Sequence, residues 1–246
     1  MATGNRSQVS DWLVGKVVSV TAATEHARVI VLDVPGWPGN QPGQHLDLRL
    51  TAEDGYQAVR SYSIASFGPD PVVELGVDEY VDGEVSPYLV RVIRSGDLVE
   101  VRGPIGRYFV WSDTQTDPVQ LIAGGSGIVP LMSIVRAHHG AAHPEPMRLL
   151  YSVRTPADAL YADELTGLVD STFTLDWVHT REAPSGSVRR AGRIDAATIA
   201  ELALPPDVEP LVYVCGPTGF VESVASILVQ RGHRADRIRT ERFGGL

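Results

Sequence analysis

Short runs of apolar, β-branched and aromatic residues recur along the first half of the chain. Gly, Pro, Asn and Asp separate these runs at regular intervals, and apolar and polar positions alternate inside several of them. Such a pattern is typical of an antiparallel barrel or sandwich. It predicts strands near residues 13–24, 27–35, 44–52, 58–66, 72–81 and 97–106.

One helical segment, residues 86–95, interrupts these strands. Ser86 is placed to cap the helix, Pro87 occupies the first helical position, and Gly96 follows the end. These residue types are favoured at those three positions because each satisfies a backbone requirement of a helix end. We therefore expect a helix between the fifth and sixth strands.

The pattern changes after the polar segment 112–118. Short buried strands now alternate with helical segments, and this order predicts a parallel sheet with helices on both faces. We therefore expect an antiparallel β-barrel over residues 1–112, followed by a doubly wound α/β domain over residues 118–246. The predicted strands lie near 119–124, 147–154, 173–182 and 210–216, and the helices near 129–140, 157–169, 195–204 and 219–232.

Composition narrows the possible functions. The 246 residues carry a formal net charge of −9, so we expect no binding to nucleic acid or to an anionic membrane surface. The first ten residues lack an apolar signal core, and the most apolar stretch, 121–135, is too short to span a bilayer. The single cysteine, Cys215, excludes an intrachain disulfide and suits a cytoplasmic location.

The titratable residues show no metal-ligand spacing, so we expect no metal site. Among the seven histidines, only His138 and His139 are adjacent, and their place near a helix end predicts a solvated pair. The paired acids Asp78 and Glu79 are interpreted as part of a solvated face.

Two glycine-containing turns follow predicted buried strands. In the first, Gly125, Ser126 and Gly127 precede a helix, whose N-terminal N–H groups could accept a phosphate group. In the second, Cys215, Gly216 and Pro217 end a strand. Both turns lie at the carboxyl edge of the sheet, where open α/β sheets bind ligands. The alternatives are a plain tight turn for the first and a small buried apolar residue for Cys215.

Arginines follow two other predicted strands. Arg154 comes directly after one strand, Thr180 and Arg181 end the next, and Arg193 follows shortly after. Several guanidinium groups at the ligand edge of an acidic chain indicate a phosphate site. The alternative is a scatter of surface arginines.

The segment RSYSIAS, residues 60–66, places a cation, an aromatic ring and hydroxyl groups in one strand. Alternation directs Arg60 and Tyr62 to one face, and Ser61 and Ser63 to the other. Without further information this is either an edge strand or part of a binding site.

Five motifs in this order resemble those of the ferredoxin–NADP⁺ reductase family. RSYS resembles its flavin-binding motif, and DGEVSPYL, residues 82–89, resembles its flavin pyrophosphate segment. GGSGIVP, VCGP and the final ERF are similar to its glycine turn, its Cys-Gly-Pro motif and its Glu-x-aromatic ending. The motifs span residues 60 to 243, and the family fold agrees with the predicted barrel and α/β domain.

The resemblance implies roles on the flavin side of a site for FAD. Arg60 would neutralise flavin phosphate, Tyr62 would pack on the isoalloxazine ring, and Ser63 would reach flavin N5, with Ser61 in the same motif. Further residues implied in FAD binding are Gly83, Val85, Ser86 and Phe243, the last covering the opposite face of the ring where other members have tyrosine.

On the nucleotide side, the resemblance implies hydride transfer from nicotinamide C4 to flavin N5. Cys215 would position the nicotinamide, with Glu241 as a polar partner, and the two glycine turns would face the nucleotide. Thr180 and Arg181 resemble the segment that holds the 2′-phosphate of NADPH. Together with Arg154 and Arg193 they favour NADPH over NADH.

The electron acceptor is expected to be a separate protein, a ferredoxin or an oxygenase component, because one cysteine cannot hold a [2Fe–2S] centre. Docking an acidic ferredoxin would need a basic patch, for which the chain offers Arg60, Arg91, Arg94 and Arg107. Two alternatives remain open. One is a reductase of diffusible acceptors such as free flavin or quinone, and the other is a nucleotide-sensing subunit without turnover.

Overall fold

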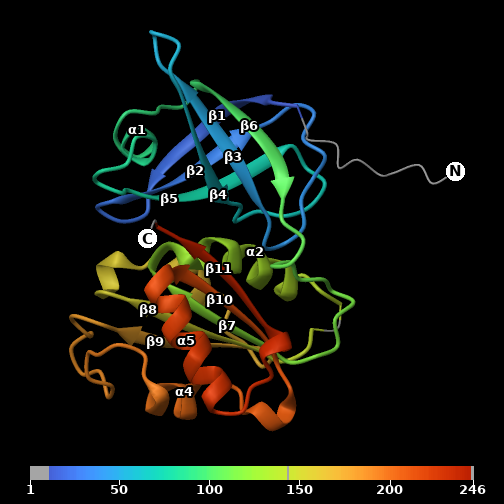
Figure 1. The fold of residues 1–246 in the computed structure, drawn as a ribbon, viewed down its shortest axis with the longest axis vertical. Helices are drawn as coiled ribbons and strands as arrows, with labels where there is room; N and C mark the ends of the chain where they lie inside the picture. The colour runs from blue at the N-terminus through green and yellow to red at the C-terminus, as the bar shows by residue number, and fades with distance from the viewer. Residues whose placement is uncertain (1–10, 143, 245–246) are drawn as a thin grey trace, which may run out of the picture.

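The computed structural model describes residues 11–142 and 144–244, and within them the strands form two sheets (Figure 1). The first sheet has the order β4-β3-β6-β1-β2-β5, and every neighbouring pair is antiparallel. Its elements are β1 Leu13–Ala22, β2 Ala27–Asp33, β3 His45–Thr51, β4 Gln57–Ser63, β5 Val72–Asp78, α1 Ser86–Arg91 and β6 Leu98–Ile105.

The two outer strands of this sheet, β4 and β5, meet and close it. Ile64, directly after β4, forms an isolated bridge with Leu75 of β5. The N–H of Ala65 donates to the carbonyl oxygen of Glu74 at 2.8 Å. This closure removes the free edges that an open sheet would expose, and it confirms the predicted antiparallel barrel.

Alternate residues of the strands fill the barrel. Leu46 and Leu48 of β3, and Val73, Leu75 and Val77 of β5, are almost completely buried, while the residues between them are not all buried. Burial of each such side chain contributes about 1.5–3 kcal/mol. The period-two pattern of the sequence therefore reports directly which face of each strand forms the core.

The second sheet is parallel throughout, with the order β11-β10-β7-β8-β9. Strands β8 and β9 are added on one side of the central strand β7, and β10 and β11 on its other side, so the strand order reverses between β7 and β10. Its elements are β7 Val119–Gly124, α2 Ile128–His139, β8 Met147–Val153, α3 Ala162–Gly167, β9 Phe173–His179, α4 Ala196–Leu202, β10 Leu211–Pro217, α5 Thr218–Gln230 and β11 Ile238–Phe243.

Helices cover both faces of this sheet, which confirms the doubly wound arrangement. Leu131 of α2 and Leu165 of α3 pack into one buried cluster, whereas Ile199 of α4 and Val224 of α5 pack into another. Figure 1 shows α2 on the side toward the barrel and α4 at the far end of the molecule.

The last strand, β11, was not expected from the sequence. Residues 238–243 pair in parallel with β10, in the register Cys215↔Glu241 and Pro217↔Phe243. Ile238 is the only residue of β11 that is buried. The strand therefore carries little apolar signal, since it lies at the edge of the sheet.

Two sequence-based expectations about helix ends were wrong. Helix α1 stops at Arg91, and Ser86 does not cap it; Val85 is the N-cap, and the Ser86 hydroxyl accepts a hydrogen bond from the Tyr80 N–H at 3.0 Å. His138 is 1% exposed rather than solvated, because its Nε2 lies 2.6 Å from the carbonyl oxygen of Glu145 and its ring packs edge-on against Trp111.

The connection between the two sheets, residues 106–118, packs against both. Phe109 and Trp111 are buried in the same cluster as α2. Gly43, in the loop before β3, donates its N–H to the Ser133 hydroxyl of α2 at 2.8 Å. A Cβ at Gly43 would lie 2.0 Å from the carbonyl oxygen of Phe109, so only glycine permits this approach.

Candidate functional site

The first glycine turn joins β7 to α2 at the point where the strand order reverses. Gly125 has φ +55°, and a Cβ there would meet no other atom within 4 Å. At Gly127, by contrast, a Cβ would lie 2.2 Å from the carbonyl oxygen of Cys215. The turn is thus open at Gly125 and tightly packed against the second turn at Gly127.

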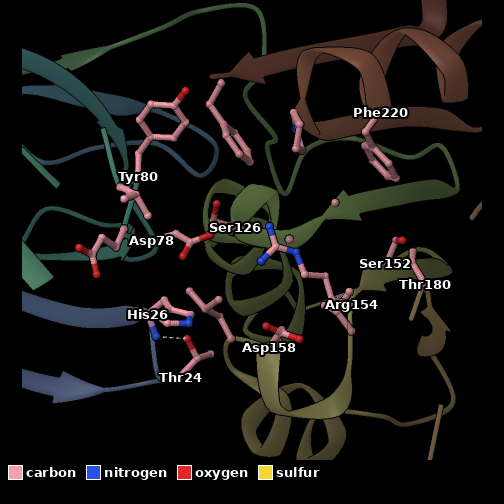
Figure 2. Close-up of a pocket in the computed structure, with 18 of the residues that line it drawn as sticks. Thr24, His26, Asp78, Tyr80, Ser126, Ser152, Arg154, Asp158, Thr180 and Phe220 are labelled. Carbon is pink, nitrogen blue, oxygen red and sulfur yellow. Dashed lines mark hydrogen bonds between the residues drawn. The ribbon is translucent and has the colours of Figure 1, made fainter. Parts of the chain in front are cut away.

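A cleft of about 590 Å³ lies in front of this turn (Figure 2). On one side of it Figure 2 shows Thr24, His26, Asp78 and Tyr80, which come from the barrel. On the other it shows Ser126, Arg154 and Thr180, which follow strands of the parallel sheet. The sequence-predicted residues that line it are Gly125, Ser126, Arg154, Thr180, Pro217 and Phe243.

Charge in the cleft is mixed. Arg154 is the cation that the parallel sheet contributes to the lining, and Asp78 enters from the barrel side. The protein around Asp78 partly desolvates its carboxyl group and raises its pKa, whereas the nearby charge of Arg154 and a hydrogen bond from Ser126 lower it. The net effect is a raised pKa of Asp78, which lines the cleft together with Ser126 and Arg154.

The backbone segments that carry the predicted arginines lie side by side, but not all of the arginine side chains line the cleft. The N–H groups of Arg181 and Glu182 donate to the carbonyl oxygen of Arg154 at 2.9 and 3.2 Å. Gly192 donates to the carbonyl oxygen of His179 at 2.9 Å, which brings Arg193 to the same edge. Arg181 and Arg193 are exposed and lie outside the residues that line the cleft.

A second pocket, of about 400 Å³, adjoins the cleft on the barrel side. It gathers the RSYS motif, the segment before α1 and the end of β11. The sequence-predicted residues that line it are Arg60, Ser61, Tyr62, Ser63, Gly83, Val85, Ser86, Ser126 and Phe243. Segments more than 180 residues apart in the sequence therefore form one pocket.

Several side chains of this pocket already have partners. Arg60 pairs with Glu84 at 2.7 Å between Nη2 and Oε2. The Ser61 hydroxyl donates to Asp47 at 2.7 Å. Burial raises the pKa of Tyr62, so its phenol stays neutral across the physiological range.

The cleft and the second pocket form one continuous site. Asp78, Tyr80, Asp82, Ser126 and Phe243 line both of them. Sequence reasoning missed the first three, because an acid or a tyrosine after an apolar strand is also what a solvated loop contains. Their position at the carboxyl end of β5 is the only signal that pointed to them.

Of the predicted catalytic residues, Ser63 lines the second pocket, whereas Cys215 and Glu241 are outside the lining of both the cleft and the second pocket. Cys215 is 1% exposed, and burial raises the pKa of its thiol, with a further rise from the nearby Glu241. Glu241 lies 3.4 Å from His45, between Oε1 and Nδ1. Its other oxygen, Oε2, is buried and has no hydrogen-bond partner among the residues that the structure describes.

Gly216 and Gly127 do not line the cleft or the second pocket; they allow the two glycine turns to pack closely. A Cβ at Gly216 would lie 2.8 Å from the ring of Phe220 and 3.2 Å from the Cα of Gly124. The two glycine turns therefore touch each other through positions where no side chain fits.

Within the described residues, neither a metal-binding cluster nor a membrane-spanning helix is found. Over residues 11–142 and 144–244, no cluster of three His, Cys, Asp or Glu side chains is arranged to hold a metal ion. No helix in that part of the chain is long and apolar enough to cross a membrane.

Two family models match this chain. Residues 14–110 match the oxidoreductase FAD-binding domain, and residues 121–226 match the oxidoreductase NAD-binding domain. The first region holds the barrel with the RSYS pocket, and the second holds β7 to α5 with both glycine turns.

Curated relatives include reductase components of oxygenase systems. The glycine betaine monooxygenase reductase subunit of Chromohalobacter salexigens is 31% identical over 208 residues, which cover 83% of this chain and 56% of that relative. The reductase component of the naphthalene 1,2-dioxygenase system of Pseudomonas putida is 27% identical over 236 residues, covering 94% and 70%. This chain spans little more than half the length of the first of these relatives.

Solved structures share the whole fold. The FAD/NAD-binding domain of nitric oxide dioxygenase from Vibrio cholerae superposes with a TM-score of 0.83 at 25% identity, covering 95% of this chain and 99% of that one. A ferredoxin NADP⁺ reductase from Neisseria gonorrhoeae gives a TM-score of 0.80 at 21% identity, covering 94% and 97%. With its antiparallel FAD-binding barrel and its NAD-binding parallel sheet, the chain belongs to the ferredoxin–NADP⁺ reductase superfamily.

Proposed function

We propose that this protein is an FAD-dependent oxidoreductase that takes a hydride from NADPH and delivers electrons to a separate ferredoxin or oxygenase component. One observation carries the proposal: the RSYS pocket and the glycine-turn cleft are a single site, joined at Ser126 and Phe243. Two redox partners held in one site are what hydride transfer requires. The names of the relatives, which are reductase components, support the separate acceptor.

The residues of the second pocket fit a flavin. Tyr62 offers a half-buried aromatic surface beside the Ser63 hydroxyl, and Arg60 offers a cation at the rim. A Cβ at Gly83 would lie 2.9 Å from the carbonyl oxygen of Tyr80, so glycine is needed where the backbone turns toward Ser86. When bound, FAD accepts a hydride from reduced nicotinamide and releases electrons one or two at a time.

The cleft fits a nicotinamide nucleotide. The open turn at Gly125 and Ser126 gives a phosphate group access to backbone N–H groups, and Arg154 supplies a cation within the same lining. Phe243 lies where the cleft and the flavin pocket meet, so it separates the two until the nicotinamide enters. Cys215 and Glu241 support this position from behind rather than reacting themselves.

NADPH is proposed over NADH. Arg154 lines the cleft with Thr180, and the backbone of Arg181 is bonded to that of Arg154. The exposed Arg181 and Arg193 side chains lie at the same edge, free to close on a 2′-phosphate. We also propose the division into residues 1–112 and 118–246, and a cytoplasmic location where NADPH is supplied and where the free Cys215 stays reduced.

The test is an absorption spectrum of the purified protein loaded with FAD, followed by anaerobic addition of NADPH or NADH. The expected result is a yellow protein that bleaches faster with NADPH. A protein that takes up no FAD would contradict the reading of the RSYS pocket. A yellow protein that neither nucleotide bleaches would support a nucleotide-sensing subunit instead.

A second candidate is a reductase of diffusible acceptors, and one observation favours it. Two of the arginines proposed to dock an acidic ferredoxin are already paired with acids, Arg60 with Glu84 and Arg91 with Glu79. Turnover with free flavin or quinone that exceeds turnover with every added ferredoxin or oxygenase component would favour this candidate.

A further inference from the structure

His45 lies directly opposite Ser63. It is the first residue of β3, and the antiparallel register pairs it with Ser63 at the end of β4. Directly opposite residues of an antiparallel pair point to the same face of the sheet. The imidazole and the serine hydroxyl therefore share the outer face of the barrel, while Leu46 and Tyr62 turn toward its core.

The same imidazole contacts the parallel sheet. His45 Nδ1 lies 3.4 Å from Glu241 Oε1, and both side chains are about one-quarter exposed (25% and 24%). Glu241 is in turn the register partner of Cys215. The pair thus links β3, the register partner of the strand that ends in Ser63, to β11, which ends in Phe243, across the junction of the two sheets.

The charged groups around this pair leave Glu241 dependent on His45. On the His45 strand, Asp47 already accepts from Arg102 at 2.6 Å and from Ser61 at 2.7 Å. On the Glu241 side, Cys215 is a buried thiol whose pKa is raised, so it adds no cation. With Oε2 buried and unpartnered, His45 supplies the ionic contact of this carboxylate among the described residues.

We propose that His45 is a positioning residue for flavin reduction. It holds Glu241, and through it the end of β11 with Phe243, against barrel strand β3 at the position opposite Ser63. The inference rests on the proposed function and adds to it a residue that the RSYS and Cys-Gly-Pro motifs do not include.

The test uses the FAD-loaded protein with His45→Gln, which removes the imidazole, and His45→Lys, which places a cation beside Glu241. At saturating NADPH we expect His45→Gln to slow flavin reduction about tenfold, with the dissociation constant for NADP⁺ within about twofold of wild type. The His45→Lys rate is expected to lie closer to the wild-type rate than the His45→Gln rate does, because an ammonium group beside Glu241 restores the contact. His139→Gln is the matched control, since His139 lies 3.9 Å from Asp170 in an exposed pair away from the site.

A second readout does not depend on turnover. Thermal unfolding of His45→Gln, Glu241→Gln and the double variant forms a cycle, and we expect a favourable coupling between the two positions. Additive effects of the two substitutions, or a His45→Gln rate equal to wild type, would overturn the role of His45 alone. A wild-type protein that NADPH fails to reduce would instead overturn the proposed function and this role with it.

Discussion

The position of the Ser63 side chain is set by its neighbours in the sheet and in the pocket. Its hydroxyl lines the proposed flavin pocket, Tyr62 precedes it on the opposite face, and His45 lies across the strand pair from it. Because the pocket walls are already in place around it, a change at Ser63 affects a polar contact without opening a cavity.

Replacing Ser63 with alanine is expected to slow flavin reduction by about tenfold to a hundredfold while FAD stays bound. A lost hydrogen bond to a reacting group costs about 1.5–3 kcal/mol in such a site. Anaerobic stopped-flow absorbance measures the rate, and the bound-FAD ratio measures binding. Ser223→Ala, at an exposed position of α5, is the control. Reduction of the Ser63→Ala protein at the wild-type rate would contradict the proposed role.

Replacing Arg181 with glutamate is expected to weaken NADPH binding by tenfold or more, and NADH binding much less. A carboxylate near a 2′-phosphate replaces an attraction of about 1.5–3 kcal/mol with a repulsion between like charges. Dissociation constants from flavin difference spectra measure both, with the exposed Arg231→Glu as the control. Equal losses for NADPH and NADH would rule out the 2′-phosphate assignment.

The site residues that the sequence predicted share a feature: each belongs to a short motif or follows an apolar strand. Arg60, Tyr62 and Ser63 stand out because polar side chains interrupt an apolar run. The pairing of Arg60 with Glu84, 24 residues away, depends on how a loop folds over the barrel and leaves no local trace. The same holds for His45, whose partner in β11 lies almost 200 residues further along the chain.

The turn Gly125–Gly127 lies between a buried strand and a helix, as the sequence predicted. We expect Gly127→Ala to lower the free energy of unfolding by about 1–3 kcal/mol, because its Cβ would collide with the Cys215 carbonyl oxygen. Urea unfolding measures the change. Gly167→Ala, where a Cβ meets nothing within 4 Å, is the matched control. Equal stability of the two variants would show that the turns do not pack as described.

Strand β11 marks the limit of element prediction. Its sequence, IRTERF, has one buried residue, so neither an apolar run nor a regular alternation announces a strand. What makes it a strand is pairing with β10, an interaction between segments that the sequence pattern does not contain. Barrel strands such as β2, β3 and β5 were predictable because several of their residues are buried and give an apolar pattern.

At the scale of the whole molecule, Arg136 connects three parts. From α2 it donates to the carbonyl oxygen of Ala65 at 3.0 Å, to Glu74 of β5 at 2.9 Å, and with two nitrogens to Glu164 of α3 at 2.7 Å. Ala65 lies two residues after Ser63, so this side chain fixes the RSYS strand relative to α2 and the glycine turn that precedes it.

We therefore expect Arg136→Gln to lower the free energy of unfolding by about 2–4 kcal/mol, because Glu74 and Glu164 lose a shared, mostly buried cation. Calorimetry measures the loss. The matched control is Arg148→Gln, since Arg148 pairs with Asp176 inside the parallel sheet alone. We also expect slower flavin reduction only in the Arg136 variant. A loss no larger than that of the control would mean that Arg136 does not fix the two sheets together.

The buried cluster that contains α2 also contains Ala27 and Ala65 of the barrel and Phe109 and Trp111 of the connection. At the junction, the buried core is therefore formed jointly by residues of both halves of the molecule. Chimaeras that exchange the barrel between members of this superfamily will fold only if residues 106–118 and the facing side of α2 are exchanged with it. Exchange of genetic segments between members of this superfamily therefore preserves the packing only if the junction residues from both domains are exchanged together.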